Sequence, residues 1–209
     1  HGVCADLVFE DKWRSADADA KKKLRTQIKA INFGLAYGMG PFKLADTLQI
    51  SKAEAEDLIE KYFTEFPNIR DFLTKLGTFG TRNGYITTFA PFKRRRWFDT
   101  WFPKIWNDRS KMQEFGSIER ASKNTPIQGS SADMTKLALI YIHREIEESW
   151  SDSVKIVMTV HDQIDTICKE EVADAWSIKM TELMEKAAKI IIPNGLLKAD
   201  TNISQTWEK

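Results

Sequence analysis

The sequence predicts an α+β fold, in which a mainly helical first half is followed by a small antiparallel sheet backed by helices. Val154–Val160 is mostly apolar and β-rich, and Ile164–Cys168 has the same character. His161-Asp162-Gln163 between them supplies a tight turn, so the two runs are expected to form a hairpin. Apolar residues at helical spacing over about 126–148 and 171–190 predict the helices that back this sheet.

In the first half, start and stop signals bound the helices. The first long helix is expected to begin near Ser15, because its hydroxyl precedes an acidic, alanine-rich turn. Gly38, Gly40 and Pro41 are expected to end it. A further helix is expected after Ser51, since Ser51-Lys52-Ala53-Glu54 is a capping-box pattern.

Two more signals follow along the chain. Pro67 is expected to end the helix that Ser51 begins and to start the next one. Asn83-Gly84 indicates a turn that leads into a short β segment at Tyr85–Thr88.

The composition is that of an ordinary globular protein. The chain has 209 residues, 42% of them hydrophobic and 29% charged, which is enough for a substantial core in one or two domains. A formal net charge of +1 argues against a uniformly basic nucleic-acid binder but leaves room for local basic patches. The two basic patches comprise Lys21, Lys22, Lys23, Arg25 and Lys29, and Arg82, Lys93, Arg94, Arg95 and Arg96.

No apolar run is long enough to span a bilayer, and the first residues show neither a signal-peptide core nor an acylation motif. The chain is therefore expected to be soluble and intracellular. Cys4 and Cys168 are too few and too isolated for a disulfide framework or a zinc site. Both are expected to be buried, reduced thiols.

Within the first long helix lies a stripe of cations and aromatic rings. Arg25, Lys29, Phe33 and Tyr37 are spaced four residues apart and are followed by Gly38, so a helix presents all four side chains on one face. Guanidinium and ammonium groups bind phosphate oxygens, and an aromatic ring can stack on a base or pack against a sugar. The face suits a nucleoside triphosphate, although the same pattern is also typical of a solvated edge beside a core stripe.

Two further motifs occur later in the chain. Arg120, Asn124 and Gln128 again recur at four-residue spacing, within ERASKNTPIQGSSADMTKLAL. His161 and Asp162 occupy the expected hairpin turn, within VMTVHDQID, where a carboxylate can hold a divalent cation. Each motif alone has an ordinary alternative, which is a polar helix face for the first and a polar turn for the second.

In this order, the three motifs resemble those of family A DNA polymerases, the bacterial DNA polymerase I type. RTQIKAINFGLAYG fills every position of the pattern Arg-x-x-x-Lys-x-x-x-Phe/Tyr-x-x-x-Tyr-Gly of that family's mobile fingers helix. VMTVHDQID looks like the palm turn Val-His-Asp-Glu, and LLKADTNISQTWEK resembles the family's terminal strand and tail. The resemblance covers nearly the whole chain and implies a helical fingers subdomain at 1–90 and the C-terminal part of a palm subdomain at 91–209.

The resemblance implies DNA-directed DNA synthesis on primer-template DNA with an incoming dNTP. Arg25 and Lys29 are expected to hold the triphosphate and to take part in catalysis, and Phe33 to pack against the sugar. Tyr37 is expected to stack near the templating base, and Gly38 to let the backbone turn closely past it.

The same resemblance implies a metal site and a DNA-binding surface. Asp162 is expected to bind Mg²⁺ as a catalytic carboxylate, and His161 to contact the primer terminus. Asn124 and Gln128 are expected to contact minor-groove acceptors, and Arg120 to support the DNA backbone. Phosphate contacts are expected from Arg94, Arg95 and Arg96.

Two departures from the family pattern bear on the metal site. Gln163 stands where the family usually has Glu, and strand alternation is expected to place Asp165 opposite Asp162. The family's other metal-binding Asp, in an upstream Asp-Tyr-Ser-x-x-Glu motif, has no counterpart in these 209 residues. One carboxylate does not hold two magnesium ions. The chain alone is therefore expected to be inactive and to need an N-terminal polymerase fragment that carries the thumb and the remaining palm.

The chain begins with His1 in the middle of a helical pattern, so it is expected to be a fragment or one half of a split protein, cytoplasmic in a bacterial or phage-infected cell. The main alternative is a non-catalytic nucleic-acid-binding module that uses the two basic patches. A hydrolase with His161 as its base ranks far below, because no nucleophile or oxyanion signature accompanies it.

Overall fold

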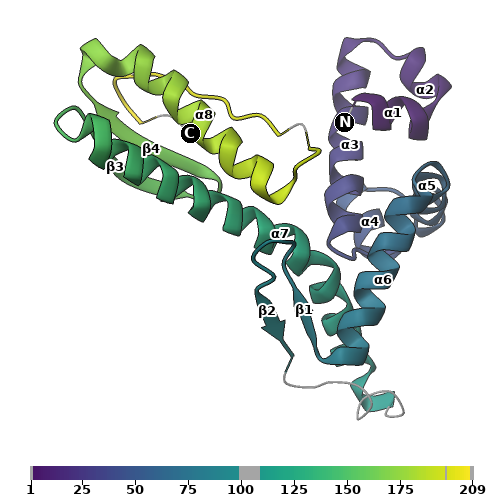
Figure 1. Cartoon of the computed structure of the whole chain (residues 1–209). Helices are drawn as coiled ribbons and strands as arrows, with labels where there is room; N and C mark the ends of the chain where they lie inside the picture. Colours follow the sequence, from purple (N-terminus) through teal and green to yellow (C-terminus); the bar gives the residue numbers. More distant parts are fainter. Residues whose placement is uncertain (1, 99–108, 196, 208–209) are drawn as a thin grey trace. The chain divides into compact units, whose positions relative to one another are not determined.

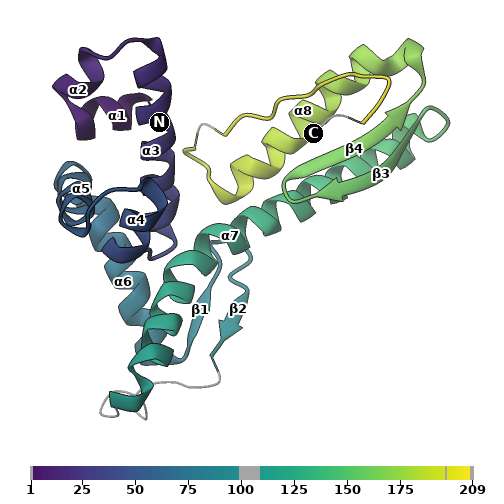
Figure 2. The ribbon, with the colours of Figure 1, turned by 180° about the vertical axis from the view of Figure 1, so that it is seen from behind.

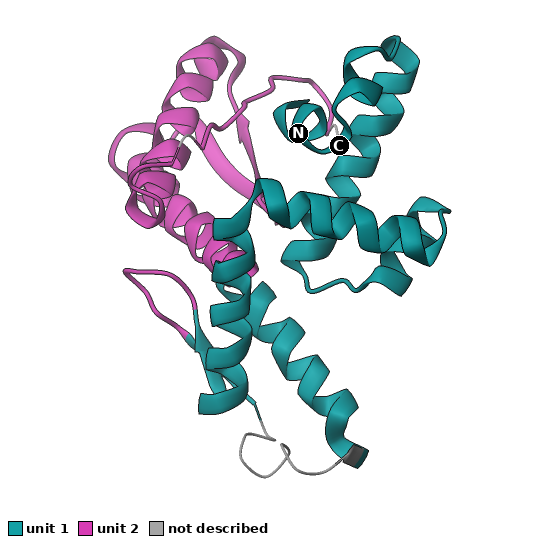
Figure 3. Cartoon of the chain, turned by 90° about the vertical axis from the view of Figure 1, so that its right-hand side faces the viewer, with its two compact units in different colours: residues 1–87, 95–126 teal, residues 88–94, 127–209 magenta. Residues whose placement is uncertain are grey.

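The computed structural model describes residues 2–98, 109–195 and 197–207. They form helices and two small antiparallel sheets, which confirms the expected α+β class (Figures 1 and 2). The chain divides into two compact units, unit 1 with residues 1–87 and 95–126, and unit 2 with residues 88–94 and 127–209 (Figure 3). The expected boundary between fingers and palm after residue 90 stays a prediction, because compact units and family subdomains are different divisions of a chain.

Unit 1 is built mainly from helices, some of which supply the buried residues of its apolar core. Its helices are α1 (Gly2–Phe9), α2 (Asp11–Arg14), α3 (Ala18–Ala36), α4 (Pro41–Leu48), α5 (Lys52–Glu65), α6 (Pro67–Asn83) and, after a short 3-10 turn at Arg109–Lys111, the first part of α7 (Met112–Glu145). Its sheet pairs β1 (Tyr85–Thr87) with β2 (Arg95–Trp97) in antiparallel register. The buried residues of the core come from α1, α3, α4 and α5, and they are Ala5, Val8, Ile28, Ile31, Leu35, Leu44, Ala55 and Tyr62.

Local signals set several helix boundaries in unit 1 as expected. The Ser51 hydroxyl accepts a hydrogen bond from the Glu54 amide, and the Ser51 amide and hydroxyl donate to the Glu54 carboxylate. These hydrogen bonds complete the capping box and lower the pKa of Glu54. Pro67 begins α6, and Gly84 ends it with a positive φ of 70°.

The start of α3 differs from the prediction. Asp17, not Ser15, is its N-cap, because the Asp17 carboxylate accepts a hydrogen bond of 2.8 Å from the Ala20 amide. Ser15 instead ends the preceding short helix, and its hydroxyl donates to the Asp11 carbonyl oxygen.

Close packing between α6 and α7 within unit 1 requires glycine. A Cβ built on Gly80 would lie 1.8 Å from Ser122 Oγ and 2.5 Å from Ser122 Cβ. Ser122 is fully buried, and its hydroxyl donates to the Ile118 carbonyl oxygen at 2.7 Å. The crossing of the two helices therefore leaves no room for a side chain at position 80.

Unit 2 is a hairpin with helices packed along it. The hairpin joins β3 (Val154–Val160) to β4 (Gln163–Cys168), and this confirms the hairpin predicted from the sequence. The second part of α7, which runs into a π-helical turn at Ile146–Trp150, and α8 (Ala173–Ile191), which follows a short 3-10 turn at Glu170–Val172, both lie along the hairpin in two views (Figures 1 and 2). The core is formed by Ala138, Ile142, Ile146, Val154, Ile164, Trp176, Met180, Leu183 and Ala187.

Two sequence predictions for this half of the chain are wrong. The helix expected from residue 126 begins at Met112, and Pro126 lies inside it. Pro126 is fully buried, so tertiary packing outweighs the hydrogen bond that a proline removes from a helix interior. The expected terminal strand is absent from the described tail, residues 197–207. That tail instead lies beside α8, where Thr201 donates to the Ser177 carbonyl oxygen.

Two further features bear on expectations from composition. Within the described ranges, no helix combines the length and apolar character needed to cross a membrane. Cys4 and Cys168 are free thiols, as expected, but each is partly rather than fully buried.

Candidate nucleotide and nucleic-acid interface

The polar face of α3 presents the stripe residues as an exposed row. Phe33 is 53% exposed and Tyr37 37% exposed, and their rings stack with centroids 6.4 Å apart. Arg25 and Lys29 are exposed, and among the described residues neither forms an ion pair. Two uncompensated cations one turn apart, followed by two rings, form a surface that can take a phosphate at one end and a planar group at the other.

The C-terminal end of α3 contacts α7 within unit 1. Gly38 has a φ of +72°, a left-handed conformation that glycine adopts readily. A Cβ at this position would lie 2.8 Å from Arg120 Cγ and 3.3 Å from Arg120 Cα. The missing side chain thus allows the chain after Tyr37 to approach the α7 residue that is expected to support DNA.

Replacing Gly38 by Ala is expected to lower the free energy of unfolding by about 2 kcal/mol. The left-handed backbone costs a Cβ-bearing residue about 1–2 kcal/mol, and the new methyl group would collide with Arg120. Urea denaturation gives the magnitude. Gly40→Ala is the matched control, because a Cβ at Gly40 meets no atom within 4 Å and its backbone is extended. An equal loss in both variants would contradict the proposed strain at Gly38.

The row of three polar residues on α7 spans both units. Arg120 and Gln128 are exposed, whereas Asn124 is partly buried. The side-chain oxygen of Asn124 is buried, and among the described residues it has no hydrogen-bond partner. Arg120 and Asn124 belong to unit 1, and Gln128 belongs to unit 2. Because Arg120, Asn124 and Gln128 are four residues apart within α7, they lie on one face of that helix, as the sequence predicts.

Two of the three consecutive arginines are held by rings and a hydroxyl. The Arg95 guanidinium lies 5.0 Å from the Tyr85 ring centroid and 5.5 Å from that of Trp97. Arg96 donates a hydrogen bond of 3.0 Å to the Thr125 hydroxyl. Among the described residues neither guanidinium has a carboxylate partner, so both charges are open to an anion.

Arg94 differs from its two neighbours. Its guanidinium forms an ion pair of 2.5 Å with Asp133, a residue of α7 that is only 6% exposed. None of the sequence motifs predicts a role for Asp133. A signal was nevertheless present, because a charged residue within an apolar helical pattern usually has a partner.

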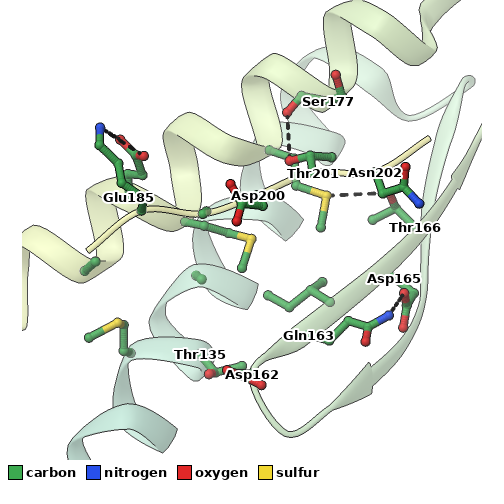
Figure 4. A pocket seen from close by; sticks show the side chains of 18 of the residues that line it. Thr135, Asp162, Gln163, Asp165, Thr166, Ser177, Glu185, Asp200, Thr201 and Asn202 are labelled. Carbon is green, nitrogen blue, oxygen red and sulfur yellow. Dashed lines mark hydrogen bonds and ion pairs between the residues drawn. The ribbon is translucent and has the colours of Figure 1, made fainter. Parts of the chain in front are cut away.

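The hairpin turn exposes His161 and Asp162. The register pairs Val160 with Gln163, so both residues lie in the turn, and His161 has a positive φ of 56°. Strand alternation does not relate Asp162 to Asp165, because Asp162 is not on a strand. Both carboxylates instead line one cavity of about 1320 Å³ within unit 2, bordered by β4, α7, α8 and the tail (Figure 4).

Gln163 is committed to a neighbour on its own strand. Its side-chain amide donates a hydrogen bond of 2.7 Å to Asp165 Oδ1 (Figure 4). The other oxygen, Asp165 Oδ2, is buried and has no hydrogen-bond partner among the described residues. Where the family usually has a carboxylate next to Asp162, this chain has an amide paired with a carboxylate two residues further on. Both residues are visible in the sequence, but the hydrogen bond between them is seen only in the structure.

Because Gln163 and Asp165 form a hydrogen bond, substitutions at the two positions are expected to have non-additive effects on stability. Gln163→Glu is expected to lower the free energy of unfolding by about 1 kcal/mol, because two carboxylates would face each other where one hydrogen bond now stands. Gln163→Glu combined with Asp165→Asn restores an amide and a carboxylate with reversed polarity, so most of that loss should be recovered. Thermal denaturation of both single variants and the double variant measures the coupling, and simple additivity would contradict it.

In the described part of the chain, no three His, Cys, Asp or Glu side chains group as a metal site would require. Asp162 can supply one carboxylate oxygen to a divalent cation, because it is exposed at the turn. The described residues thus fit one ligand of a two-ion site and not the complete set.

The class of protein follows from comparison with known families. The family model described as DNA polymerase family A matches residues 1–209. The chain belongs to that family, and the resemblance inferred from its three motifs is confirmed.

Particular relatives are bacterial DNA polymerases I. The enzyme of Bacillus caldotenax is 32% identical over 197 residues, which cover 94% of this chain and 21% of that protein. The thermostable DNA polymerase I of Thermus aquaticus is 32% identical over 184 residues, covering 88% and 20%. The chain therefore spans about a fifth of the length of these relatives.

A solved structure shares the fold. The POL domain of Pol1 from M. smegmatis, in complex with DNA primer-template and dNTP, matches with a TM-score of 0.75 and 32% sequence identity. The match covers 90% of this chain and 31% of that one.

Proposed function

We propose that this chain forms the fingers and the C-terminal part of the palm of a DNA-directed DNA polymerase, with the fingers at residues 1–90 and the palm at 91–209. The observation that carries the proposal is the exposed α3 face, on which two cations without ion-pair partners in the described ranges precede two rings. Membership of family A and the solved relative with bound primer-template and dNTP support it.

On α3, each residue has a distinct role toward the incoming dNTP. Arg25 and Lys29 hold the triphosphate through charge-assisted hydrogen bonds and offset the charge that develops as pyrophosphate leaves. Phe33 packs against the sugar, and Tyr37 stacks near the templating base. Gly38, which directly follows Tyr37, lies against Arg120, so the end of the nucleotide-binding row and a DNA-binding residue of α7 are close together within unit 1.

DNA is held mainly through its backbone. Arg120, Arg95 and Arg96 contact phosphates, which gives affinity without sequence preference. Arg94, expected from the sequence to do the same, is instead engaged by Asp133. Asn124 and Gln128 donate hydrogen bonds to minor-groove acceptors that all base pairs share, so they test pairing geometry rather than sequence. His161 contacts the primer terminus from the hairpin turn.

Catalysis also depends on Asp162. Its carboxylate would hold Mg²⁺, and a bound pair of such ions would supply activation of the primer 3′ oxygen and neutralisation of the charge on the leaving pyrophosphate. The second carboxylate comes from outside this chain, on an N-terminal polymerase fragment that carries the thumb and the remaining palm. The isolated chain is therefore inactive. A cytoplasmic location is part of the proposal, in keeping with the bacterial source of its relatives.

Reconstitution tests this function. The purified chain is mixed with an N-terminal polymerase fragment, and extension of a labelled primer is followed with and without Mg²⁺. Extension is expected only when both polypeptides and Mg²⁺ are present. Robust extension by the chain alone would refute the requirement for a second carboxylate.

A non-catalytic nucleic-acid-binding module is the second candidate. It is favoured by the lack of a complete acidic metal site in the described part of the chain. Such a module would shift primer-template DNA in a gel but would not extend the primer with any partner fragment, so the reconstitution experiment separates the two candidates.

A further inference from the structure

We propose that Arg94 is a positioning residue that acts through Asp133. Their ion pair fastens the loop Thr88–Arg94 to the turn of α7 that follows Gln128, and so fixes the part of the surface that meets DNA in unit 2. The DNA-binding half of this inference rests on the proposed function. The fastening itself does not.

A set of hydrogen bonds joins the loop to one turn of α7. Arg94 Nε donates to Asp133 Oδ1 at 2.5 Å, and Arg94 Nη2 donates to the Gly129 carbonyl oxygen at 3.3 Å. At the other end of the loop, the Phe89 amide donates to the Ser130 hydroxyl at 2.8 Å. All three acceptors lie within five residues after Gln128, so the loop is tied to α7 from both of its ends.

The loop is also closed on itself. The Thr88 amide donates to the Arg94 carbonyl oxygen at 2.9 Å, and the Arg94 amide donates to the Thr88 hydroxyl at 3.0 Å. The backbone of Arg94 therefore forms hydrogen bonds within the loop, whereas its side chain forms hydrogen bonds with α7. Removing the guanidinium would leave the loop closed but detached from α7 at that end.

Burial makes Asp133 dependent on Arg94. Asp133 is 6% exposed, whereas the Arg94 side chain is 51% exposed. Asp133 Oδ2 is buried and has no hydrogen-bond partner among the described residues. A buried carboxylate is costly without a paired cation. The pair is thus a structural requirement of α7, and not an incidental surface contact.

The same geometry limits what Arg94 can offer to DNA. Its Nε and Nη2 form one edge of the guanidinium, and this edge is already engaged by Asp133 and Gly129. An arginine that binds phosphate bidentately uses such an edge. Arg95, which has no carboxylate partner in the described ranges, keeps its charge available for phosphate.

Variants of the pair distinguish positioning from phosphate binding. Primer-template affinity of the full chain is measured by fluorescence anisotropy over a range of salt concentrations, for Asp133→Asn, Arg94→Gln and the double variant. Asp133→Asn adds one net positive charge, which alone would strengthen DNA binding. We expect it instead to weaken affinity about fivefold, as Arg94→Gln does, and the double variant to be no weaker than Arg94→Gln. The slope of log affinity against log salt should stay unchanged.

Arg95→Gln is the matched control within the same arginine run. It should lower the salt slope by about one, as expected when one phosphate contact is lost. The proposal is overturned if Asp133→Asn binds DNA as tightly as the unchanged chain or more tightly, or if Arg94→Gln lowers the salt slope as Arg95→Gln does.

Hydrogen exchange tests the fastening without DNA. In Asp133→Asn, amide protection at Phe89 and Arg94 should fall at least tenfold, while amides of β3 and β4 stay protected and show that unit 2 is folded. Unchanged protection at Phe89 and Arg94 would overturn the proposal. If the unchanged chain binds no DNA but the exchange result is as expected, the proposed function fails and the fastening stands.

Discussion

Asp162→Asn is expected to slow primer extension by the reconstituted protein roughly 1000-fold, equivalent to about 4 kcal/mol of lost transition-state stabilisation. The amide keeps the size of the side chain but loses the charge that, in the proposed function, holds a divalent cation. Binding of primer-template DNA should be nearly unchanged, because Asp162 lies in an exposed turn and makes no hydrogen bond that supports the hairpin within the described residues. Single-turnover extension and a gel shift measure the two effects separately.

A neighbouring carboxylate serves as the control for Asp162. Asp152 lies in the exposed turn before β3, in the same unit, and Asp152→Asn removes the same charge. Extension by this variant should stay close to that of the unchanged protein. Comparable activity of the two variants would mean that Asp162 is not a catalytic ligand.

Gly80→Ala should produce the largest loss of stability, about 3 kcal/mol for overpacking of a close helix contact. Alanine is a better helix former than glycine by about 1 kcal/mol, so propensity alone predicts the opposite sign. The collision decides the outcome, because the new Cβ would lie 1.8 Å from the Ser122 hydroxyl oxygen in the α6–α7 crossing. The midpoint of urea denaturation measures the effect.

Second-site variants identify the collision as the cause. Ser122→Ala removes the hydroxyl but leaves the Ser122 Cβ at 2.5 Å, so it should not restore Gly80→Ala, whereas Ser122→Gly should restore it in part. Gly77→Ala on the same helix face should cost less than 1 kcal/mol, since its Cβ meets the flexible Glu119 side chain at 2.9 Å. Equal losses for Gly77→Ala and Gly80→Ala would contradict this account.

Fold elements were predictable where their signals are local. The Ser51–Glu54 capping box, Pro67 at the start of α6 and the β3–β4 hairpin each depend on residues close in sequence, and the structure contains all three. The start of α7 was not predictable in this way. Pro126 marks a helix start by its own chemistry, but its burial inside α7 is decided by packing.

The candidate site follows the same division. Periodicity alone identified the exposed row on α3 and the polar row on α7. Asp133 was not predicted as a site residue, and Asp165 was predicted only to lie opposite Asp162, because the importance of both residues comes from the contacts that their oxygens make or lack. For Asp133 the partner is 39 residues away in sequence. For Asp165 the partner, Gln163, is two residues away on the same strand. Strand alternation places the two side chains on one face but does not show that they form a hydrogen bond.

By itself the sequence determined the family, the α+β class and the residues that share a helix face, because spacing along a regular helix or strand fixes direction. Only the tertiary structure decided which cations stay open to an anion. Arg94 is neutralised by a buried carboxylate, while Arg25 and Lys29 have no such partner in the described ranges. It also decided that Gly38 must lie against Arg120. The physical reason is that charge pairing and close approach depend on distances between remote segments, which folding sets and local spacing does not record.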